Sequence, residues 1–274
     1  MTGMIRKSIV AGSWYPDIPD ILRDDISRYM EKASAPEIPD KPAVIISPHA
    51  GYMFSGGVAG YAYKAVSDHH YKTVVVISPS HRAYFPFVSV WAHGGFETPL
   101  GIIEVDEDLC GRLIASSEIF KDDQRAHANE HALEIQLPFL QSALGSFTLC
   151  PLIMGRQDFS LCEDLAHALA EQIRNPEEVL MVASSDLSHF HPARKAEIMD
   201  STVARHIEDF DIDGLSRDLE HGEIEACGGG PILVALLYAR ALGRKNTRVL
   251  NYAHSGHITG DNASVVGYLS AAIY

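Results

Sequence analysis

The sequence predicts one α/β domain over residues 1–274, with a central, mainly parallel or mixed sheet flanked by helices. Apolar runs of strand length alternate along the chain with amphipathic stretches of helical length, as in proteins whose helices cover a sheet. No internal repeat or low-complexity linker divides the chain, and a single α/β domain can have this length. These two observations together favour one domain.

The first part of the chain contains one βαβ unit. Residues 20–33 carry apolar side chains at helical spacing, and the proline-bounded segment 36–42 interrupts this pattern and predicts a linker. The β-branched run 43–47 predicts a buried strand, residues 57–66 can form a helix, and 73–78 predicts a second buried strand.

The rest of the chain continues the alternation of strands and helices. A more polar segment predicts a strand at 87–91, a hairpin turn through 98–101 and a helix at 107–116. Helical spacing then predicts four further helices, at 130–144, 161–174, 193–210 and 231–242. Apolar runs predict four further strands, at 148–154, 179–183, 248–253 and 264–269.

Composition and charge exclude several classes of function. The chain is 46% hydrophobic and 21% charged, which is typical of a soluble globular protein. A net charge of −14 without a Lys/Arg run argues against a nucleic-acid partner. No apolar run approaches the roughly 18 residues of a membrane span, and the apolar stretch near the start is too short for a signal peptide. We therefore expect a cytoplasmic protein without a membrane partner. The four cysteines form no C-x-x-C pair, which favours reduced thiols.

Three apolar strands end alike, because each runs into small polar residues and then a histidine: His49, His81 and His189. A single histidine at such a place more often caps backbone groups. Three in the same context favour a shared pocket, since the carboxyl ends of parallel strands meet at one edge of a sheet. Imidazole is a good ligand for zinc, iron, copper or nickel, so these histidines predict a metal site. Asp186 could ligate the metal, orient a histidine or transfer protons. His189 could also transfer protons.

A second group of histidines precedes the predicted helix at 130–144. His127 to His131 spells H-x-x-E-H, which on one helix places two zinc ligands and a base together. Asn129 suits an N-cap and Glu130 a first helical turn, so we expect the helix to begin after His127 and this geometry to be absent. His131 and Glu134 share a helical face and could line the pocket or form a surface ion pair.

A glycine-rich turn precedes the helix predicted at 231–242. Its glycines, Gly228, Gly229 and Gly230, could offer backbone N–H groups to an anion, or could simply satisfy a tight turn. Cys227 comes just before them, and proximity to a helix N-terminus lowers a thiol pKa, so this residue is a candidate nucleophile or soft ligand. His254 and His257 lie between the last two strands and could also reach the pocket.

As an ordered set, these motifs resemble the Memo family, whose prokaryotic members are called component B of the AMMECR1, Memo and radical-SAM system. The matching segments span nearly the whole chain: 10–16, 47–52, 78–81, 130–131 with 134, 137–138, 184–189, 227–228 and 251–253. The resemblance implies a single Memo-like domain, an α/β fold related to class III extradiol dioxygenases, and AMMECR1-like and radical-SAM partners. Those dioxygenases are non-haem iron enzymes.

The resemblance also implies site residues. His49, His81 and His189 match pocket histidines of the family, and Asp186 matches its neighbouring aspartate. In animal members a cysteine of the last loop joins two histidines at the metal, and an ungapped match puts Ile258 there, which leaves the third ligand open.

Three functions follow as expectations. The first is a metal-binding, dioxygenase-like oxidoreductase that uses a divalent transition metal, Fe(II) before Cu or Zn. The second is a pocket that binds a peptide or small anion without catalysis, since animal members are described as binding phosphotyrosine-containing segments. The third is metal-dependent hydrolysis, with Glu134 or Asp186 as general base.

Overall fold

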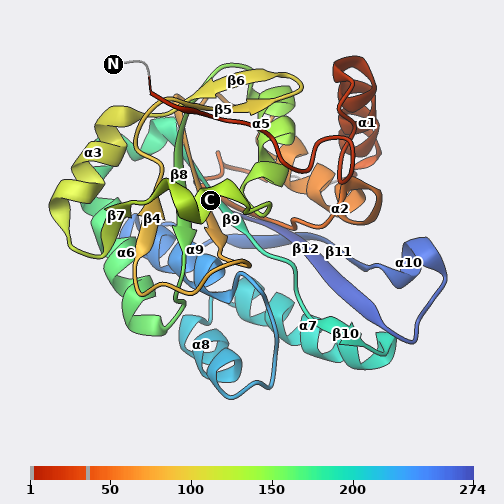
Figure 1. Ribbon diagram of the computed structural model, residues 1–274. Coiled ribbons are helices and arrows are strands. Elements are labelled where there is room, and N and C mark those ends of the chain that lie inside the picture. The colour runs from red at the N-terminus through yellow and green to blue at the C-terminus, as the bar shows by residue number, and fades with distance from the viewer. Residues whose placement is uncertain (1–2, 35–37) are drawn as a thin grey trace.

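The computed structural model describes residues 3–34 and 38–274, so the first two residues of the predicted 36–42 linker lie outside the described residues. It confirms the predicted α/β fold with a mixed sheet (Figure 1). Among the described residues, the main sheet has nine strands. At its centre are four parallel neighbours, in the order β2 (Val44–Ser47), β9 (Val179–Ser184), β3 (Thr73–Pro79) and β8 (Thr148–Met154).

Antiparallel strands extend both sides of this parallel core. On one side lie β12 (Val265–Ile273), β11 (Thr247–His254) and β10 (His189–His191). On the other side lie β4 (Val88–Val90), which is antiparallel to β8, and β7 (Phe120–Asp122), which is parallel to β4. A separate three-stranded sheet joins β1 (Ile5–Arg6) to the predicted hairpin, β5 (Gly95–Thr98) and β6 (Gly101–Glu104).

The uninterrupted apolar runs explain the parallel core. All residues of β2, β3 and β9 are buried, as expected for strands covered on both faces. The register pairs Ser47 with Ser184 and Ala183 with Ile77, so these three strands end at the same edge of the sheet. The loops that follow them therefore start side by side, which is the arrangement that the strand-end histidines require.

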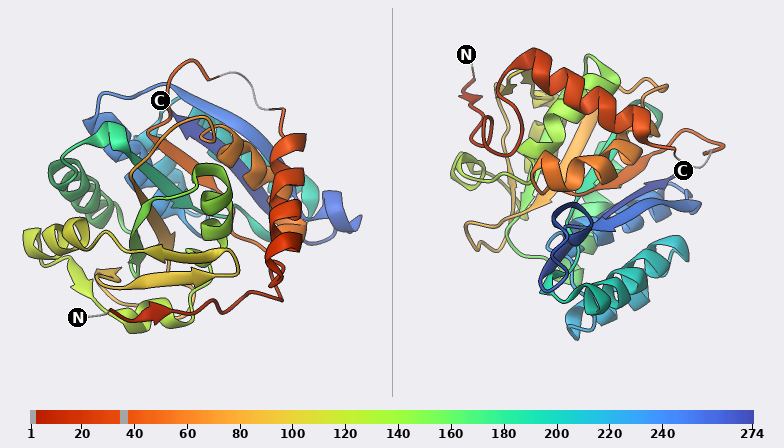
Figure 2. Two further views of the ribbon diagram at one scale, coloured as in Figure 1. Left: turned by 90° about the horizontal axis from the view of Figure 1, so that it is seen from above. Right: turned by 90° about the vertical axis from the view of Figure 1, so that its right-hand side faces the viewer.

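Helices cover both faces of the sheet (Figure 2). One face is covered by α2 (Tyr52–Lys64), with α1 (Pro19–Lys32) and α5 (Leu137–Leu144) packed against it. The other carries α9 (Gly229–Ala241), α6 (Phe159–Gln172), α7 (Ala193–Glu208) and α8 (Ile212–Glu220), and α3 (Glu107–Ser116) packs against α6. Within residues 3–34 and 38–274, no helix combines the length and the apolar character that crossing a bilayer requires.

Glycines allow α1 and α2 to approach closely. A Cβ atom on Gly60 would lie 2.6 Å from the Tyr29 carbonyl oxygen, and one on Gly56 would lie 2.7 Å from the Tyr29 ring. These glycines belong to α2, which begins at Tyr52 and not at the predicted residue 57. Their role is therefore close helix packing, and the helix tolerates them because it is buried between α1 and the sheet.

The helix predicted at 130–144 was wrong in its first half. The segment follows α4 (Gln124–Ala128) and folds as an irregular stretch, the short 3₁₀ helix η1 (Glu134–Gln136) and then α5. The irregular stretch exists because Glu130 and Glu134 turn inward to buried partners instead of extending a solvent-facing helical surface. Pro138 then begins α5, as proline does in a first helical turn.

Other differences concern element ends and short elements. The predicted helix 193–210 ends at Glu208, and α8 follows it as an unpredicted helix whose N-cap, Asp211, accepts a hydrogen bond from the Gly214 N–H at 2.9 Å. The final strand extends to Ile273. The unpredicted short elements also include β1, β7, β10, α10 (Gly256–Thr259) and η2 (Pro176–Glu178).

Candidate metal centre

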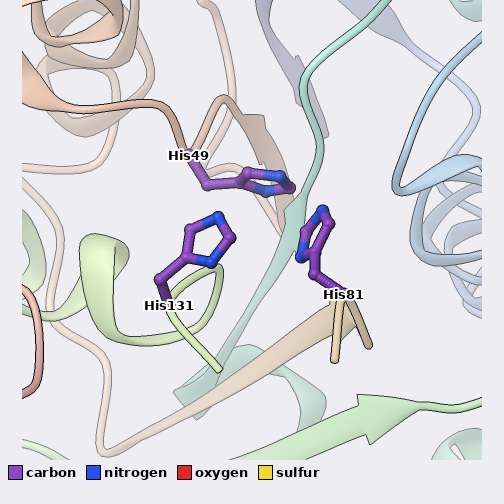
Figure 3. A group of neighbouring side chains, drawn as sticks. All are labelled: His49, His81 and His131. Atoms are coloured by element: carbon purple, nitrogen blue, oxygen red, sulfur yellow. The ribbon is translucent and has the colours of Figure 1, made fainter. Parts of the chain in front are cut away.

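Three histidine side chains converge at the carboxyl edge of the parallel strands (Figure 3). His49 follows β2, His81 follows β3, and His131 lies in the irregular stretch before η1. Each offers a ring nitrogen, and these nitrogens lie within 4.8 Å of one another. The ring centroids are 4.7 to 5.6 Å apart. Two of the three strand-end histidines are thus in the cluster, and His131 takes the place expected for His189.

The surroundings of His49 fix which ring nitrogen is free. Its Nδ1 lies 2.9 Å from the Ser184 hydroxyl, and that hydroxyl already donates to the Ala132 carbonyl at 2.7 Å. Since a hydroxyl has one hydrogen to donate, His49 Nδ1 must be the donor to Ser184. The Nε2 atom therefore keeps its lone pair for another partner, as a metal ligand requires.

A buried carboxylate orients His81 in the same way. Glu130 accepts from the His81 backbone N–H at 2.6 Å, and its other oxygen lies 3.0 Å from His81 Nδ1. Burial alone would raise the pKa of Glu130, but hydrogen bonds from His81 and from the Ala132 N–H outweigh it and lower the pKa to about 2. The ionised carboxylate holds the Nδ1 proton, so His81 Nε2 is free, an arrangement common beside metal ligands.

Burial keeps the other two rings uncharged. It lowers the pKa of His49 to about 3, with the neighbouring His81 acting in the same direction. It also lowers the pKa of His131 to about 4, helped by His49. Neutral imidazoles carry the lone pairs that metals bind, so near pH 7 both rings are in the ligating form. The Trp14 ring covers His131 at a centroid distance of 4.3 Å.

The histidines open into a cavity of about 510 Å³. Its polar wall adds Asp186 and His189 to the cluster, and the apolar side chains that line it are Trp14, Ala50, Met53, Phe54, Val266 and Tyr268. Burial raises the pKa of Asp186 to about 6. The backbone N–H of His49 donates a hydrogen bond to Asp186 at 2.7 Å and opposes this rise. A carboxyl with that pKa can take up or release a proton near neutral pH.

His189 lines the cavity without belonging to the close cluster. It begins β10, and a register irregularity between His189 and His191 pairs them with consecutive residues of β12. The backbone N–H of His189 donates to Glu225 at 3.3 Å, and His191 Nε2 lies 2.9 Å from the same carboxylate. The residue between the two histidines, Phe190, has a φ of 62°. The position of His189 fits contact with a bound molecule better than ligation beside His49.

Cys227 lies beside the cluster, with its sulfur 3.1 Å from His49 Nε2 and 3.2 Å from the Asp186 N–H. Burial and the nearby Asp186 raise its thiol pKa, so the expected lowering by a helix N-terminus is wrong. Ile258, which the family match aligns with the cysteine of animal members, is 55% exposed on α10 and is not among the residues that line the cavity. The cysteine available to this site is therefore Cys227, which can ligate once a metal displaces its proton.

Several predicted site residues lie elsewhere. Glu134 is fully buried and turned away from His131; its carboxylate accepts hydrogen bonds from Arg6 and Tyr15, so the expected pair does not form. His254 stacks on His257 at 3.8 Å, and its Nε2 lies 3.5 Å from Glu197. Neither of these two histidines is among the residues that line the cavity.

The glycine turn also differs from its expected role as an anion site. The Gly228 N–H donates to Ser185 Oγ at 2.9 Å, the Gly229 N–H to the Ala226 carbonyl at 3.1 Å, and the Gly230 N–H to Gln157 Oε1 at 2.8 Å. These donors are used within the chain, which corrects the anion-binding interpretation. The turn is tight because a Cβ atom on Gly228 would lie 2.2 Å from the Ser184 carbonyl oxygen.

The H-x-x-E-H sequence does not form a zinc-binding helix, as expected, but for a different reason. His127 lies within α4, which ends at Ala128, before His131. The His127 ring is buried against Trp91 and Phe96, with centroid distances of 5.9 and 6.1 Å. Sequence reasoning missed the two supporting residues of the centre, Glu130 and Trp14. Glu130 is the glutamate of the H-x-x-E-H sequence, and both residues lie in segments that match the family, but none of these signals indicated contact with His81 or His131.

The buried histidines predict a loss of stability in acid. The pKa of His127 is lowered to about 3 by burial, like that of His49. An unfolded histidine titrates near 6.5, so the unfolded state takes up a proton first as the pH falls. The contribution of these neutral histidines to stability is therefore complete above about pH 6.5 and falls by about 3 kcal/mol per group as the pH approaches 4. Urea unfolding at pH 7.5 and pH 4.5 measures this, and His127→Phe should flatten the dependence while metal binding is unchanged. An equal dependence in this variant would contradict the assignment.

Comparisons with known proteins agree along nearly the whole chain. A family model described as Memo-like protein matches residues 6–272. The chain is 38% identical to a MEMO1 family protein of Sulfolobus acidocaldarius, covering 97% of this chain and 98% of that protein. It is 36% identical to a MEMO1 family protein of Methanothermobacter thermautotrophicus, with 97% and 99% covered. A crystal structure of an uncharacterised Escherichia coli K12 protein has the same fold at 13% identity, with a TM-score of 0.54 and coverage of 84% and 99%.

Proposed function

Because the chain belongs to the Memo family, we propose that His49, His81 and His131 hold a divalent transition-metal ion, Fe(II) before Cu or Zn, in a dioxygenase-like oxidoreductase. The observation that carries this proposal is the convergence of three ring nitrogens within 4.8 Å of one another. The ligating state of the rings supports it, since Ser184 and Glu130 leave the Nε2 lone pairs of His49 and His81 free.

The donor set fits a catalytic ion better than a purely structural one. Three nitrogen donors leave coordination positions open, and Cys227 stands beside His49 as a further soft donor. A bound iron or copper ion supplies one-electron and oxygen chemistry, which no side chain of the cluster can supply alone. AMMECR1-like and radical-SAM proteins remain proposed partners through the family resemblance.

The chain's own residues would bind the organic substrate and move its proton. The apolar wall formed by Trp14, Phe54 and Tyr268 suits a small molecule with a flat or apolar body and excludes water around it. Asp186 also lines the cavity and can accept a proton at near-neutral pH. His189 lines the same cavity and can contact the polar end of the molecule.

The experiment is reconstitution under anaerobic conditions. Purified protein should take up one equivalent of Fe(II), measured by elemental analysis after removal of free metal. A titration with Fe(II), Cu and Zn then ranks the metals. Admission of oxygen to the iron-loaded protein with small organic candidates should give oxygen uptake that the metal-free protein lacks. Protein that retains no metal under any of these conditions would contradict the proposal.

The orienting carboxylate provides a sharper prediction. Glu130→Gln keeps the shape of the side chain but loses the charge that holds the His81 Nδ1 proton. We expect Fe(II) affinity to fall by about 10 to 100-fold, the usual effect of losing such a partner. Glu107→Gln is the matched control, because Glu107 contacts His93 at 3.2 Å on the exposed surface. Calorimetry measures both, and equal affinities for the two variants would show that Glu130 does not orient a ligand.

A further inference from the structure

A buried ion pair joins the start of the chain to the segment that carries the candidate metal centre. Arg6 and Glu134 are 4% and 0% exposed in their side chains and form a direct salt bridge across 128 positions of sequence. A buried pair of this kind is costly to form unless further hydrogen bonds satisfy both groups. The contacts of each partner therefore show what the pair holds in place.

Arg6 holds the backbone that carries the centre. Its Nε donates to the His127 carbonyl at 3.0 Å and its Nη2 to the Glu130 carbonyl at 2.6 Å. The His127 carbonyl lies near the end of α4, and the Glu130 carbonyl lies in the irregular stretch directly before His131. The side chain of Glu130 orients His81, so one guanidinium fixes the backbone of both the orienting carboxylate and the adjacent ligand. The planar fork of arginine makes several such contacts at once.

Glu134 fixes the segment of the chain that carries Trp14. Its carboxylate accepts from the N–H groups of Ile9 and Val10 at 3.0 and 3.1 Å and from the Tyr15 hydroxyl at 2.8 Å. The segment between these residues carries Trp14, whose N–H donates to the Val10 carbonyl at 2.8 Å. The Trp14 carbonyl accepts from the Tyr52 N–H at 2.8 Å, which anchors the segment to α2.

We propose that Arg6 and Glu134 are positioning residues that clamp Trp14 against His131 and so set the geometry of the candidate metal centre, an inference that rests on the proposed function. The ring of Trp14 lies 4.3 Å from that of His131 and lines the same cavity. Arg6 fixes the His131 side of this contact and Glu134 fixes the Trp14 side. Loss of the ion pair would release both the His131 backbone and the Trp14 segment, while the parallel sheet that carries His49 and His81 stays intact.

The test uses Co(II) alone as the metal probe and acrylamide quenching of Trp14 fluorescence as a second readout. We expect Glu134→Gln to weaken Co(II) binding by about tenfold, as for other groups that orient ligands. Quenching of Trp14 should rise, and Trp14→Phe provides the contribution of Trp91 for subtraction. Tyr15→Phe removes one hydrogen bond to Glu134 and should move both readouts less in the same direction. Tyr15→Phe also provides the test if the Glu134→Gln variant does not fold.

Lys7→Gln is the matched control, because Lys7 pairs with Glu97 from the next position of the same segment but is 71% exposed. It should leave both readouts unchanged. A purely structural pair would lower the unfolding midpoint of Glu134→Gln and Tyr15→Phe but leave Co(II) affinity and Trp14 quenching in the folded state at parental values, and that result overturns the inference. If the parent binds no Co(II), the proposed function fails, and quenching of Trp14 alone then decides whether the clamp exists.

Discussion

Replacement of His49 or His81 by alanine is expected to remove metal binding. In each ring the partner at Nδ1, Ser184 for His49 and Glu130 for His81, leaves the Nε2 lone pair available to a metal. Since loss of an orienting partner alone costs about 10 to 100-fold in affinity, loss of a ligand should cost at least about 100-fold. Anaerobic calorimetry with Fe(II) measures the effect. His131→Ala should be weakened too, with Cys227 as a remaining donor beside His49.

The controls for this prediction are histidines outside the cluster. His167 is exposed on α6, where it pairs with Glu171, and His254 stacks on His257 away from the cavity lining. Alanine at either position should leave Fe(II) affinity at the parental value. If His49→Ala binds Fe(II) as tightly as His167→Ala, the convergence of the rings does not create the site.

A second large effect is expected for Gly228→Ala. The added Cβ atom would lie 2.2 Å from the Ser184 carbonyl oxygen and 2.7 Å from the Ser185 Cβ atom. Ser184 belongs to β9 and binds His49, so neither side can move without disturbing the centre. We expect a loss of about 1 to 3 kcal/mol or more in the free energy of unfolding, the usual cost of overpacking. Weaker metal binding should accompany it, because Cys227 precedes the displaced turn.

Gly229→Ala is the neighbouring control. Its Cβ atom would lie 3.0 Å from the end of the Leu219 side chain, which can adjust. Alanine in a helix is also more favourable than glycine, so this variant should unfold within about 1 kcal/mol of the parent. Urea unfolding and Fe(II) calorimetry compare the two variants. Equal unfolding midpoints for Gly228→Ala and the parent would refute the close approach of α9 to Ser184.

The buried strands could be predicted because their signal is local. Uninterrupted apolar runs placed β2, β3, β8 and β9 within a residue or two of their observed bounds. The general rule that parallel strands end at one edge then brought His49 and His81 together without any knowledge of side-chain contacts. His189 was also placed at this edge, but the irregular pairing of β10 with β12 moves it to the cavity wall.

The rest of the centre could not be predicted because it depends on contacts between distant segments. Helical spacing favoured a continuous helix through Glu130 and Glu134, whereas both carboxylates turn inward to partners at His81 and Arg6. Those partners lie 49 and 128 positions away in sequence. The pKa of the Cys227 thiol is likewise set by burial and by the nearby Asp186, and not by the helix that follows it.

The most direct test of the central claim is a crystal structure of the protein soaked anaerobically with Fe(II), with anomalous diffraction recorded at the iron edge. We predict one strong anomalous peak between His49, His81 and His131, about 2 Å from a nitrogen of each ring, as for other metal–imidazole bonds. A fourth donor, such as the Cys227 sulfur beside His49, can complete the set. An anomalous map with no peak among these three histidines, or with its peak elsewhere on the chain, would contradict the account.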